Sequence, residues 1–185
     1  MAGAESLTGK VVEKCYASIS EFVEAKYRDT CSYGIKSFGV EQACEAGDNF
    51  LGLILSVKFS VIVKQQQKTG AEDRKGERED FDLILKSQSL NSNGKDSEKY
   101  FWAALFYKER MIYEEIVARL EQLGQLPLAP KLHHFYSEEE DYSSLLMDNL
   151  ISLGYYIPDF ATVTLDECIS IMEALARFHA LSVGM

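Results

Sequence analysis

Two segments of the chain carry charged side chains in apolar surroundings. The run FDLILK (81–86) has the aliphatic residues of a buried strand and ends on Lys86. Because a lysine is rarely buried without a partner, Lys86 is expected to meet an anion. Further along, the pattern F-x-x-E-x-x-x-Y places Phe106, Glu109 and Tyr113 on one face of a helix. A glutamate between two aromatic side chains is poorly placed for a solvated surface charge, so Glu109 is a candidate partner.

A lysine on a strand followed by a glutamate on a helix is the arrangement with which protein kinases position a lysine on the phosphates of ATP. The alternative is a strand-end lysine in water and an ordinary helix glutamate, and these two segments alone leave both interpretations open. A third segment, EAGDNFLG (45–52), lies just before the next alternating strand pattern. Its turn could present backbone N–H groups to phosphate oxygens, or it could be a tight hairpin and nothing more.

The elements that position these residues alternate between helical and extended patterns. Apolar residues at helical spacing predict a helix over 8–27. Alternating apolar and polar residues over 56–63 predict a strand with one buried face. The charged segment 64–80 is expected to be an exposed hairpin loop that leads into FDLILK as the partner strand.

A long helix is expected over residues 98–123, after a polar loop over 87–98. Gly124 and Pro127 follow it and would end it. Its apolar stripe is expected to face the core. The residues of this stripe are Phe101, Leu105, Ile112, Ile116, Leu120 and Leu123.

Two further motifs complete the order of elements. LHHFYS and YSSLLMDNL flank EEED and predict a hairpin, in which His133 and His134 would point to opposite faces of the sheet. Thr164 and Glu167 form a T-x-x-E capping box that predicts the start of a last helix. Helix, strands, helix, hairpin and helices in this order predict an α+β fold rather than a doubly wound parallel sheet.

Five motifs in sequence order resemble the ecdysteroid kinase-like family, which is related to choline kinases and aminoglycoside phosphotransferases. They are G-D-N-F, L-I-L-K, F-x-x-E-x-x-x-Y, L-L-M-D-N-L-x-x-x-G-Y and L-A-R-F-H-A-L-S, and the resemblance covers residues 35–182. It implies a protein-kinase-like N-terminal lobe with an antiparallel sheet and a long helix, then a hinge and the first helices of a C-terminal lobe. The lobe with its leading helix would occupy residues 1–150, and the start of a truncated C-terminal lobe would occupy 151–185.

The resemblance also implies roles for particular residues, with ATP and Mg²⁺ as cofactors. Lys86 would be the phosphate-binding lysine and Glu109 its helix partner. The family usually has Glu-Asp-Leu in the hinge, where this chain has Asp-Asn-Leu. The phosphate-covering turn would be Gly47, Asp48 and Asn49, and the hinge whose backbone holds adenine would be Met147, Asp148, Asn149 and Leu150.

Two functional hypotheses follow from the resemblance. The first is the ATP-binding lobe of a small-molecule kinase that phosphorylates a hydroxyl group of an ecdysteroid-like acceptor. Relatives carry a catalytic H-G-D-x-x-x-x-N loop and a later metal-binding aspartate, which have no match in these residues, so we assign no catalytic residue and no metal ligand. The alternative is a catalytically dead, truncated kinase-like module that acts through nucleotide or protein binding. An acceptor is expected to bind only when the C-terminal lobe is present.

The composition indicates which classes of binding partner and which cellular location to expect. The net charge of −10 without a basic block argues against nucleic-acid and anionic-membrane binding. The most apolar stretch, 51–63, is short and interrupted by Lys58, and the first ten residues lack the apolar segment of a secretory signal. Four cysteines without a C-x-x-C pair favour reduced thiols and a cytoplasmic location. An apolar stripe on the last helix is expected to drive self-association; it comprises Leu165, Ile169, Met172 and Leu175.

Overall fold

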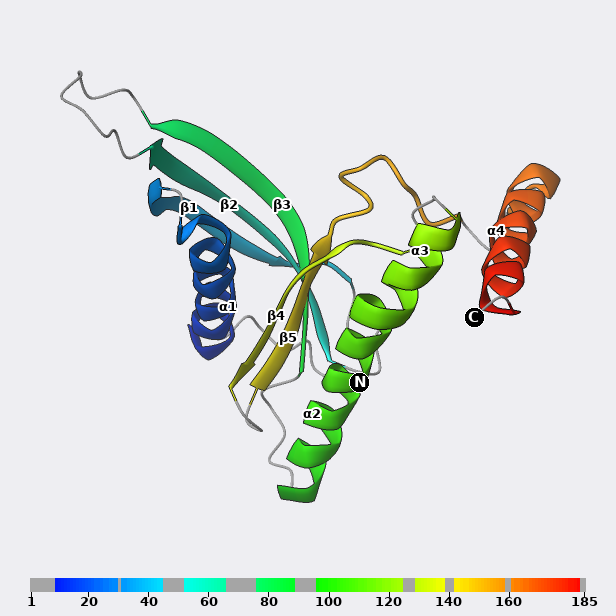
Figure 1. Ribbon diagram of the computed structural model, residues 1–185, viewed down its shortest axis with the longest axis horizontal. Coiled ribbons are helices and arrows are strands. Elements are labelled where there is room, and N and C mark those ends of the chain that lie inside the picture. Colours follow the sequence, from blue (N-terminus) through cyan, green and yellow to red (C-terminus); the bar gives the residue numbers. More distant parts are fainter. Residues whose placement is uncertain are drawn as a thin grey trace.

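A computed structural model of the chain describes residues 9–29, 31–44, 52–65, 76–88, 96–124, 129–138, 142–158 and 161–183. The strands form one antiparallel sheet in the order β1-β2-β3-β5-β4 (Figure 1). The predicted α+β class is confirmed and matches a kinase-like N-terminal lobe. The elements are α1 (Gly9–Tyr27), β1 (Cys31–Gln42), β2 (Leu53–Gln65), β3 (Glu77–Ser87), α2 (Asp96–Met111), η1 (Ile112–Val117), α3 (Ala118–Gly124), β4 (Leu132–Glu138), β5 (Tyr142–Asp148) and α4 (Leu165–Val183).

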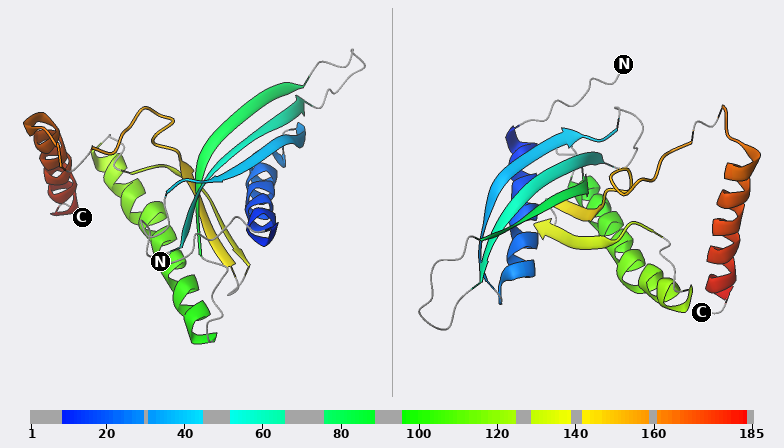
Figure 2. Two further views of the ribbon diagram at one scale, coloured as in Figure 1. Left: turned by 180° about the vertical axis from the view of Figure 1, so that it is seen from behind. Right: turned by 90° about the horizontal axis from the view of Figure 1, so that it is seen from above.

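Helices cover both faces of the sheet, which lies between α1 and α2 (Figures 1 and 2). Successive side chains of a strand point to opposite faces, so each strand contributes to two apolar clusters. The α1 cluster holds Val11, Cys15, Ile19, Phe22, Val23, Tyr27, Leu55, Val57, Phe59, Val61, Leu83, Leu85 and Leu146. The α2 cluster holds Phe106, Leu145 and Met147, with Ile84, Tyr113, Leu132 and Phe135 packed against it.

The third strand is longer than predicted. β3 begins at Glu77, and its first residues pair with the end of β2, so the prediction of a loop was wrong for 64–65 and 77–80. Glu79 accepts hydrogen bonds from the side chains of Lys26 and Tyr27 on α1, which gives this charged stretch a structural role. Gly76 lies outside the strands, as predicted, and residues 66–75 of the predicted loop lie outside the described residues.

The long helix begins at Asp96 and changes to π-helical geometry over Ile112–Val117 before it ends at Gly124. The predicted core stripe was wrong for most of its members, since Phe101, Ile112, Ile116 and Leu123 are exposed. The sheet-facing side instead carries Phe106, Glu109 and Tyr113. Leu120 is the member of the predicted stripe that is fully buried. A π turn adds a residue to the helical repeat, so a stripe with a constant period cannot continue through it.

The hairpin was predicted correctly, but its two histidines were not. The register of β4 shifts between Leu132 and His134, which marks a β-bulge. The ring centroids of His133 and His134 lie 6.1 and 6.3 Å from that of Phe22 on α1, so both rings are on the α1 side of the sheet. The bulge thus overrides the alternation on which the prediction rested.

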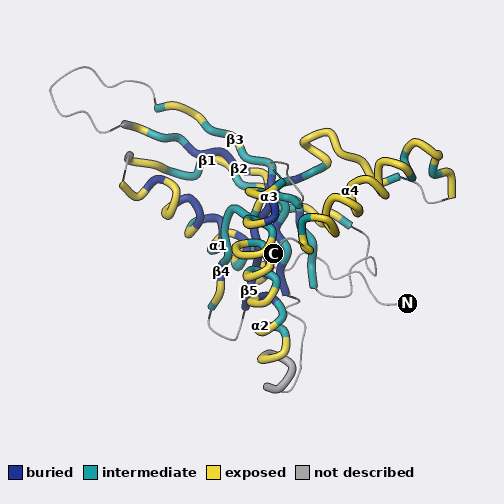
Figure 3. Tube along the Cα trace, turned by 45° about the vertical axis from the view of Figure 1, so that its right-hand side comes forward, coloured by how far each residue is buried: buried dark blue, intermediate teal, exposed yellow. Residues whose placement is uncertain are grey.

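The last helix begins at the predicted capping box. Glu167 Oε2 accepts hydrogen bonds of 2.7 Å from both the backbone N–H and the hydroxyl of Thr164, and Glu167 N–H donates back to Thr164 Oγ1 at 3.3 Å. Side chains along α4 are mostly exposed (Figure 3). Its end packs on α3, where a Cβ at Gly124 would lie 2.7 Å from Leu181. Within the described ranges, none of the helices is both long enough and apolar enough to cross a membrane.

Candidate functional site

Lys86 lies on the face of β3 that is covered by α2. It pairs with Ile54 of β2 and with Leu145 of β5, and Leu145 is fully buried beneath the helix. The Nζ atom of Lys86 lies 2.7 Å from both Oε1 and Oε2 of Glu109. The structure therefore brings together the two residues that the sequence singled out.

The ion pair is only partly exposed to solvent. The Lys86 and Glu109 side chains are 18% and 28% exposed. Phe106 is buried one helical turn before Glu109, and Tyr113 packs one turn after it. Burial, followed by the nearby negative charge of Glu109, raises the pKa of Tyr113. Tyr113 therefore stays a neutral phenol at physiological pH.

Gly52, the residue before β2, approaches the end of β3 close to Lys86. Gly52 has a φ of +125°, and a Cβ there would lie 2.1 Å from the carbonyl oxygen of Ser87. Only a glycine fits this backbone approach. Ile54, two residues later, is the register partner of Lys86. The predicted phosphate-covering residues Gly47, Asp48 and Asn49 lie outside the described residues, so their placement stays a prediction.

The predicted hinge leaves the sheet at the C-terminal end of β5. Met147 is buried in the α2 cluster, and Asp148 is the last residue of β5. Asp148 Oδ2 accepts a hydrogen bond of 3.2 Å from the backbone N–H of Lys131, and Oδ1 lies 2.6 Å from His133 Nε2. The hinge is thereby fixed to β4 on the α1 side of the sheet.

Asn149 fixes the hinge from the opposite face. Its Nδ2 donates a 2.8 Å hydrogen bond to Asp82 Oδ1, while its Oδ1 accepts from the N–H groups of Ile151 (3.2 Å) and Ser152 (3.4 Å). The Ser152 hydroxyl donates to the other Asp82 oxygen at 2.7 Å, and Lys58 Nζ lies 3.8 Å from it. All these groups lie on the Lys86 face.

These contacts lower the pKa of the Asp82 carboxyl. Burial alone raises the pKa of its carboxyl, but the hydrogen bonds from Asn149 and Ser152 and the charge of Lys58 together lower it below the ordinary value. Asp82 and Ser152 were not among the predicted site residues. In FDLILK, Asp82 and Lys86 share a face because they are four residues apart on a strand, and that alternation is the signal that could have identified Asp82.

The predicted hinge and Lys86 are separated along β3. Lys86 is three residues along β3 from Leu83, which pairs with Asp148 of the hinge. At about 3.4 Å per residue this separation is about 10 Å. A single ligand that reached both the predicted hinge and Lys86 would have to be elongated.

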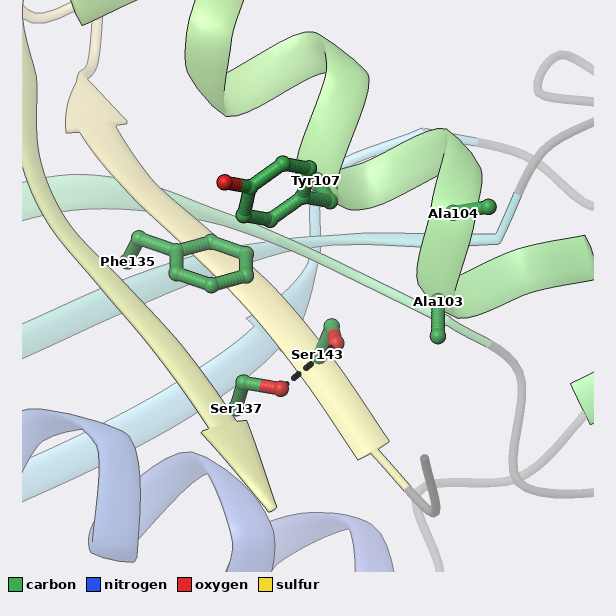
Figure 4. Close-up of a pocket in the computed structure, with 6 residues that line it drawn as sticks. All are labelled: Ala103, Ala104, Tyr107, Phe135, Ser137 and Ser143. Atoms are coloured by element: carbon green, nitrogen blue, oxygen red, sulfur yellow. Dashed lines mark hydrogen bonds between the residues drawn. The ribbon is translucent and has the colours of Figure 1, made fainter. Parts of the chain in front are cut away.

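A separate pocket of about 250 Å³ opens between α2 and the β4–β5 hairpin (Figure 4). Tyr107 and Phe135 form its aromatic walls, and Ser137 and Ser143 are joined by a 3.2 Å hydrogen bond at its floor. It excludes Lys86 and Glu109, so it is distinct from the predicted site. In the part of the chain that the structure describes, no three His, Cys, Asp or Glu side chains gather in a way that could hold a metal ion.

The chain matches the sequence model of the ecdysteroid kinase-like family over residues 46–185. It belongs to that family. The matched range includes every candidate site residue, from Gly47 to Leu150, and the resemblance inferred from the five motifs is confirmed. Family membership assigns the chain the kinase-like fold of small-molecule phosphotransferases. Comparisons with curated proteins and with solved structures gave no significant match.

Proposed function

We propose that residues 1–150 are the ATP-binding lobe of a small-molecule kinase whose acceptor is a hydroxyl group of an ecdysteroid-like compound. One observation carries this proposal: Lys86 Nζ lies 2.7 Å from both carboxylate oxygens of Glu109. A carboxylate that accepts two hydrogen bonds orients the ammonium group and leaves its third N–H for a phosphate oxygen. The family assignment supports the same role.

The backbone of Leu150 suits the other end of the nucleotide. Its carbonyl oxygen already accepts hydrogen bonds from Leu153 N–H and Tyr155 N–H at 3.2 and 2.9 Å. Its N–H has no partner among the residues that the structure describes. In our proposal this N–H donates to a ring nitrogen of adenine. Asp148, two residues before Leu150, lies about 10 Å from Lys86 along the sheet. The nucleotide that we propose extends from Leu150 past this point to the ammonium group.

We also propose that the kinase uses Mg²⁺. Mg²⁺ is usually bound by substrate phosphates together with one or two carboxylates, and it neutralises phosphate charge when bound. We assign it no ligand in this chain. Residues 151–185 would begin the second lobe, which would complete the acceptor site. The cysteine pattern favours a cytoplasmic location.

Nucleotide binding without turnover is the behaviour that we propose for residues 1–185 alone. Phosphoryl transfer needs a group that orients the acceptor hydroxyl, and no H-G-D-x-x-x-x-N motif occurs in these residues. Incubation with labelled ATP and a panel of ecdysteroids, choline and aminoglycosides should give no labelled product. Turnover that disappears in Lys86→Ala would mean that a catalytic carboxylate has been overlooked.

Isothermal titration with Mg-ATP tests the binding proposal. Hydrogen bonds to charged groups contribute about 1.5–3 kcal/mol, so Lys86→Ala should weaken binding roughly 10-fold or more. Lys108→Ala is the matched control, because it removes the same charge from an exposed position beside Glu109 on α2. Equal affinities for wild type and Lys86→Ala would remove Lys86 from the site.

A further inference from the structure

The contact between Asp82 and Asn149 joins the hinge to β3 through side chains alone. Asn149 is almost fully buried, at 9% exposure. Both ends of its amide are engaged, with the donor end on Asp82 and the acceptor end on the N–H groups of Ile151 and Ser152. Leu150 lies between these anchored positions, so the direction of its N–H depends on the side chain of Asn149.

The contact pairs one amide with one carboxylate, so that a donor meets an acceptor. Asp82 accepts from Asn149 and from Ser152, and a carboxylate can only accept. Asn149 donates on one side and accepts on the other, which its amide can do and a carboxylate at the same position cannot. An aspartate at 149 would place two acceptor oxygens of like charge at the 2.8 Å contact.

We propose that Asn149 and Asp82 are positioning residues, which hold the hinge so that Leu150 N–H faces the ring of the bound nucleotide. This inference rests on the proposed nucleotide site and adds to it the pair that determines base binding. Neither residue contacts the phosphates, because Asp82 lies four residues along β3 from Lys86. The pair therefore governs the heteroaromatic part of the ligand and leaves the anionic part to Lys86.

An exchange of the two side chains tests the pair. Asn149→Asp alone should weaken Mg-ATP binding by roughly 10-fold, because the like-charged contact displaces the hinge. The double variant Asp82→Asn with Asn149→Asp keeps the net charge and exchanges the donor and acceptor sides of the hydrogen bond. The new amide at 82 can donate to the carboxylate at 149, which still accepts from the N–H groups of 151 and 152. We expect its affinity to return to within about 3-fold of wild type.

Inorganic tripolyphosphate separates positioning from a general loss of structure. Asn149→Asp should leave its binding to the Lys86 end unchanged, whereas Lys86→Ala should weaken the binding of tripolyphosphate and ATP alike. The inference is overturned if Asn149→Asp binds ATP like wild type, if the double variant stays as weak as the single one, or if tripolyphosphate binding falls in parallel. It is also overturned if wild type binds ATP no better than tripolyphosphate, a result that would leave the phosphate site intact. Wild type that binds neither ligand would refute the proposed function itself.

Discussion

Lys86 and Glu109 are 23 positions apart in the chain, yet one ammonium group lies 2.7 Å from both oxygens of one carboxylate. The strand brings the lysine to a buried sheet face, and the helix brings the glutamate to the same point between Phe106 and Tyr113. Because each charge is largely withdrawn from water, each depends on the other for its stabilisation.

This dependence predicts non-additive substitutions. Removing one partner of a fully buried pair costs about 3–5 kcal/mol, and we expect less here because both side chains keep some exposure. Lys86→Met and Glu109→Gln should show a coupling of about 0.5–3 kcal/mol in the free energy of unfolding, measured by urea denaturation of both singles and the double. Lys108→Met with Glu109→Gln is the control cycle and should be additive. A coupling of zero between Lys86 and Glu109 would mean that both residues behave as ordinary surface charges.

Gly52 predicts a contrast between two glycine substitutions. Gly52→Ala places a Cβ 2.1 Å from the Ser87 carbonyl oxygen in a backbone conformation that side chains rarely adopt. It should lower the unfolding free energy by at least about 1–3 kcal/mol. Gly34→Ala in β1 meets nothing within 4 Å and should be neutral or stabilising by up to about 1 kcal/mol. Chemical denaturation of both variants checks this, and equal effects would contradict the close approach to Ser87.

His134 predicts a dependence of stability on pH. Burial lowers its pKa below the ordinary 6.5, although the charge of Glu21 partly opposes this. The unfolded chain therefore binds a proton that the folded protein does not. The contribution of His134 to the unfolding free energy is complete above pH 6.5. It decreases as the pH drops below 6.5, and it stops decreasing below the pKa of His134 in the folded protein.

Two variants with opposite effects check the assignment to His134. His134→Gln should make the unfolding free energy less dependent on pH between 5 and 7.5. Glu21→Gln removes the charge that raises the pKa and should steepen the dependence. A profile that is identical in wild type and His134→Gln would assign the pH dependence to other groups.

The capping box predicts a local effect on α4. Thr164→Ala removes the hydroxyl that exchanges hydrogen bonds with Glu167, so the first turn of the helix should open more often. Faster hydrogen exchange of the Glu167 amide, measured by NMR, is the expected result. Thr164→Ser keeps the hydroxyl and should exchange at nearly the wild-type rate. Unchanged exchange in the alanine variant would mean that α4 is held by other contacts.

The exposed face of α4 predicts self-association. Leu165, Ile169, Met172 and Leu175 are 75%, 47%, 62% and 46% exposed, as expected if a further layer normally covers them. Light scattering should report concentration-dependent association of the wild type. Leu165→Lys combined with Met172→Lys should reduce it, because two charges interrupt the patch. A clean wild-type monomer at high concentration would show that this face does not drive association.

The predictable parts of the molecule are those in which a period in the sequence maps onto one face of one element. The alternation over 56–63 and the three- and four-residue spacing around Glu109 were sufficient for β2 and for the ion pair. The capping box around Thr164 is equally local, since its hydrogen bonds form within one helical turn.

The features that the sequence did not predict depend on a change of period or on partners far apart in the chain. The bulge in β4 and the π turn at Ile112–Val117 each add a residue, and no glycine or proline marks either one. Asp82 and Asn149 are 67 positions apart, and their contact follows from the pairing of β3 with β5. That pairing is a property of the whole sheet, so no local pattern could have shown it.

The position of β5 inside the sheet has a mechanical consequence. β5 lies between β3 and β4 and is hydrogen-bonded to both, so the chain leaves the sheet from an interior strand (Figure 1). A force on the residues beyond Asn149 would have to shear two ladders together, whereas a strand at an edge could be peeled from one. Rotation of whatever follows the hinge would therefore be taken up by backbone torsions within 149–154, and the sheet that carries Lys86 would keep its register.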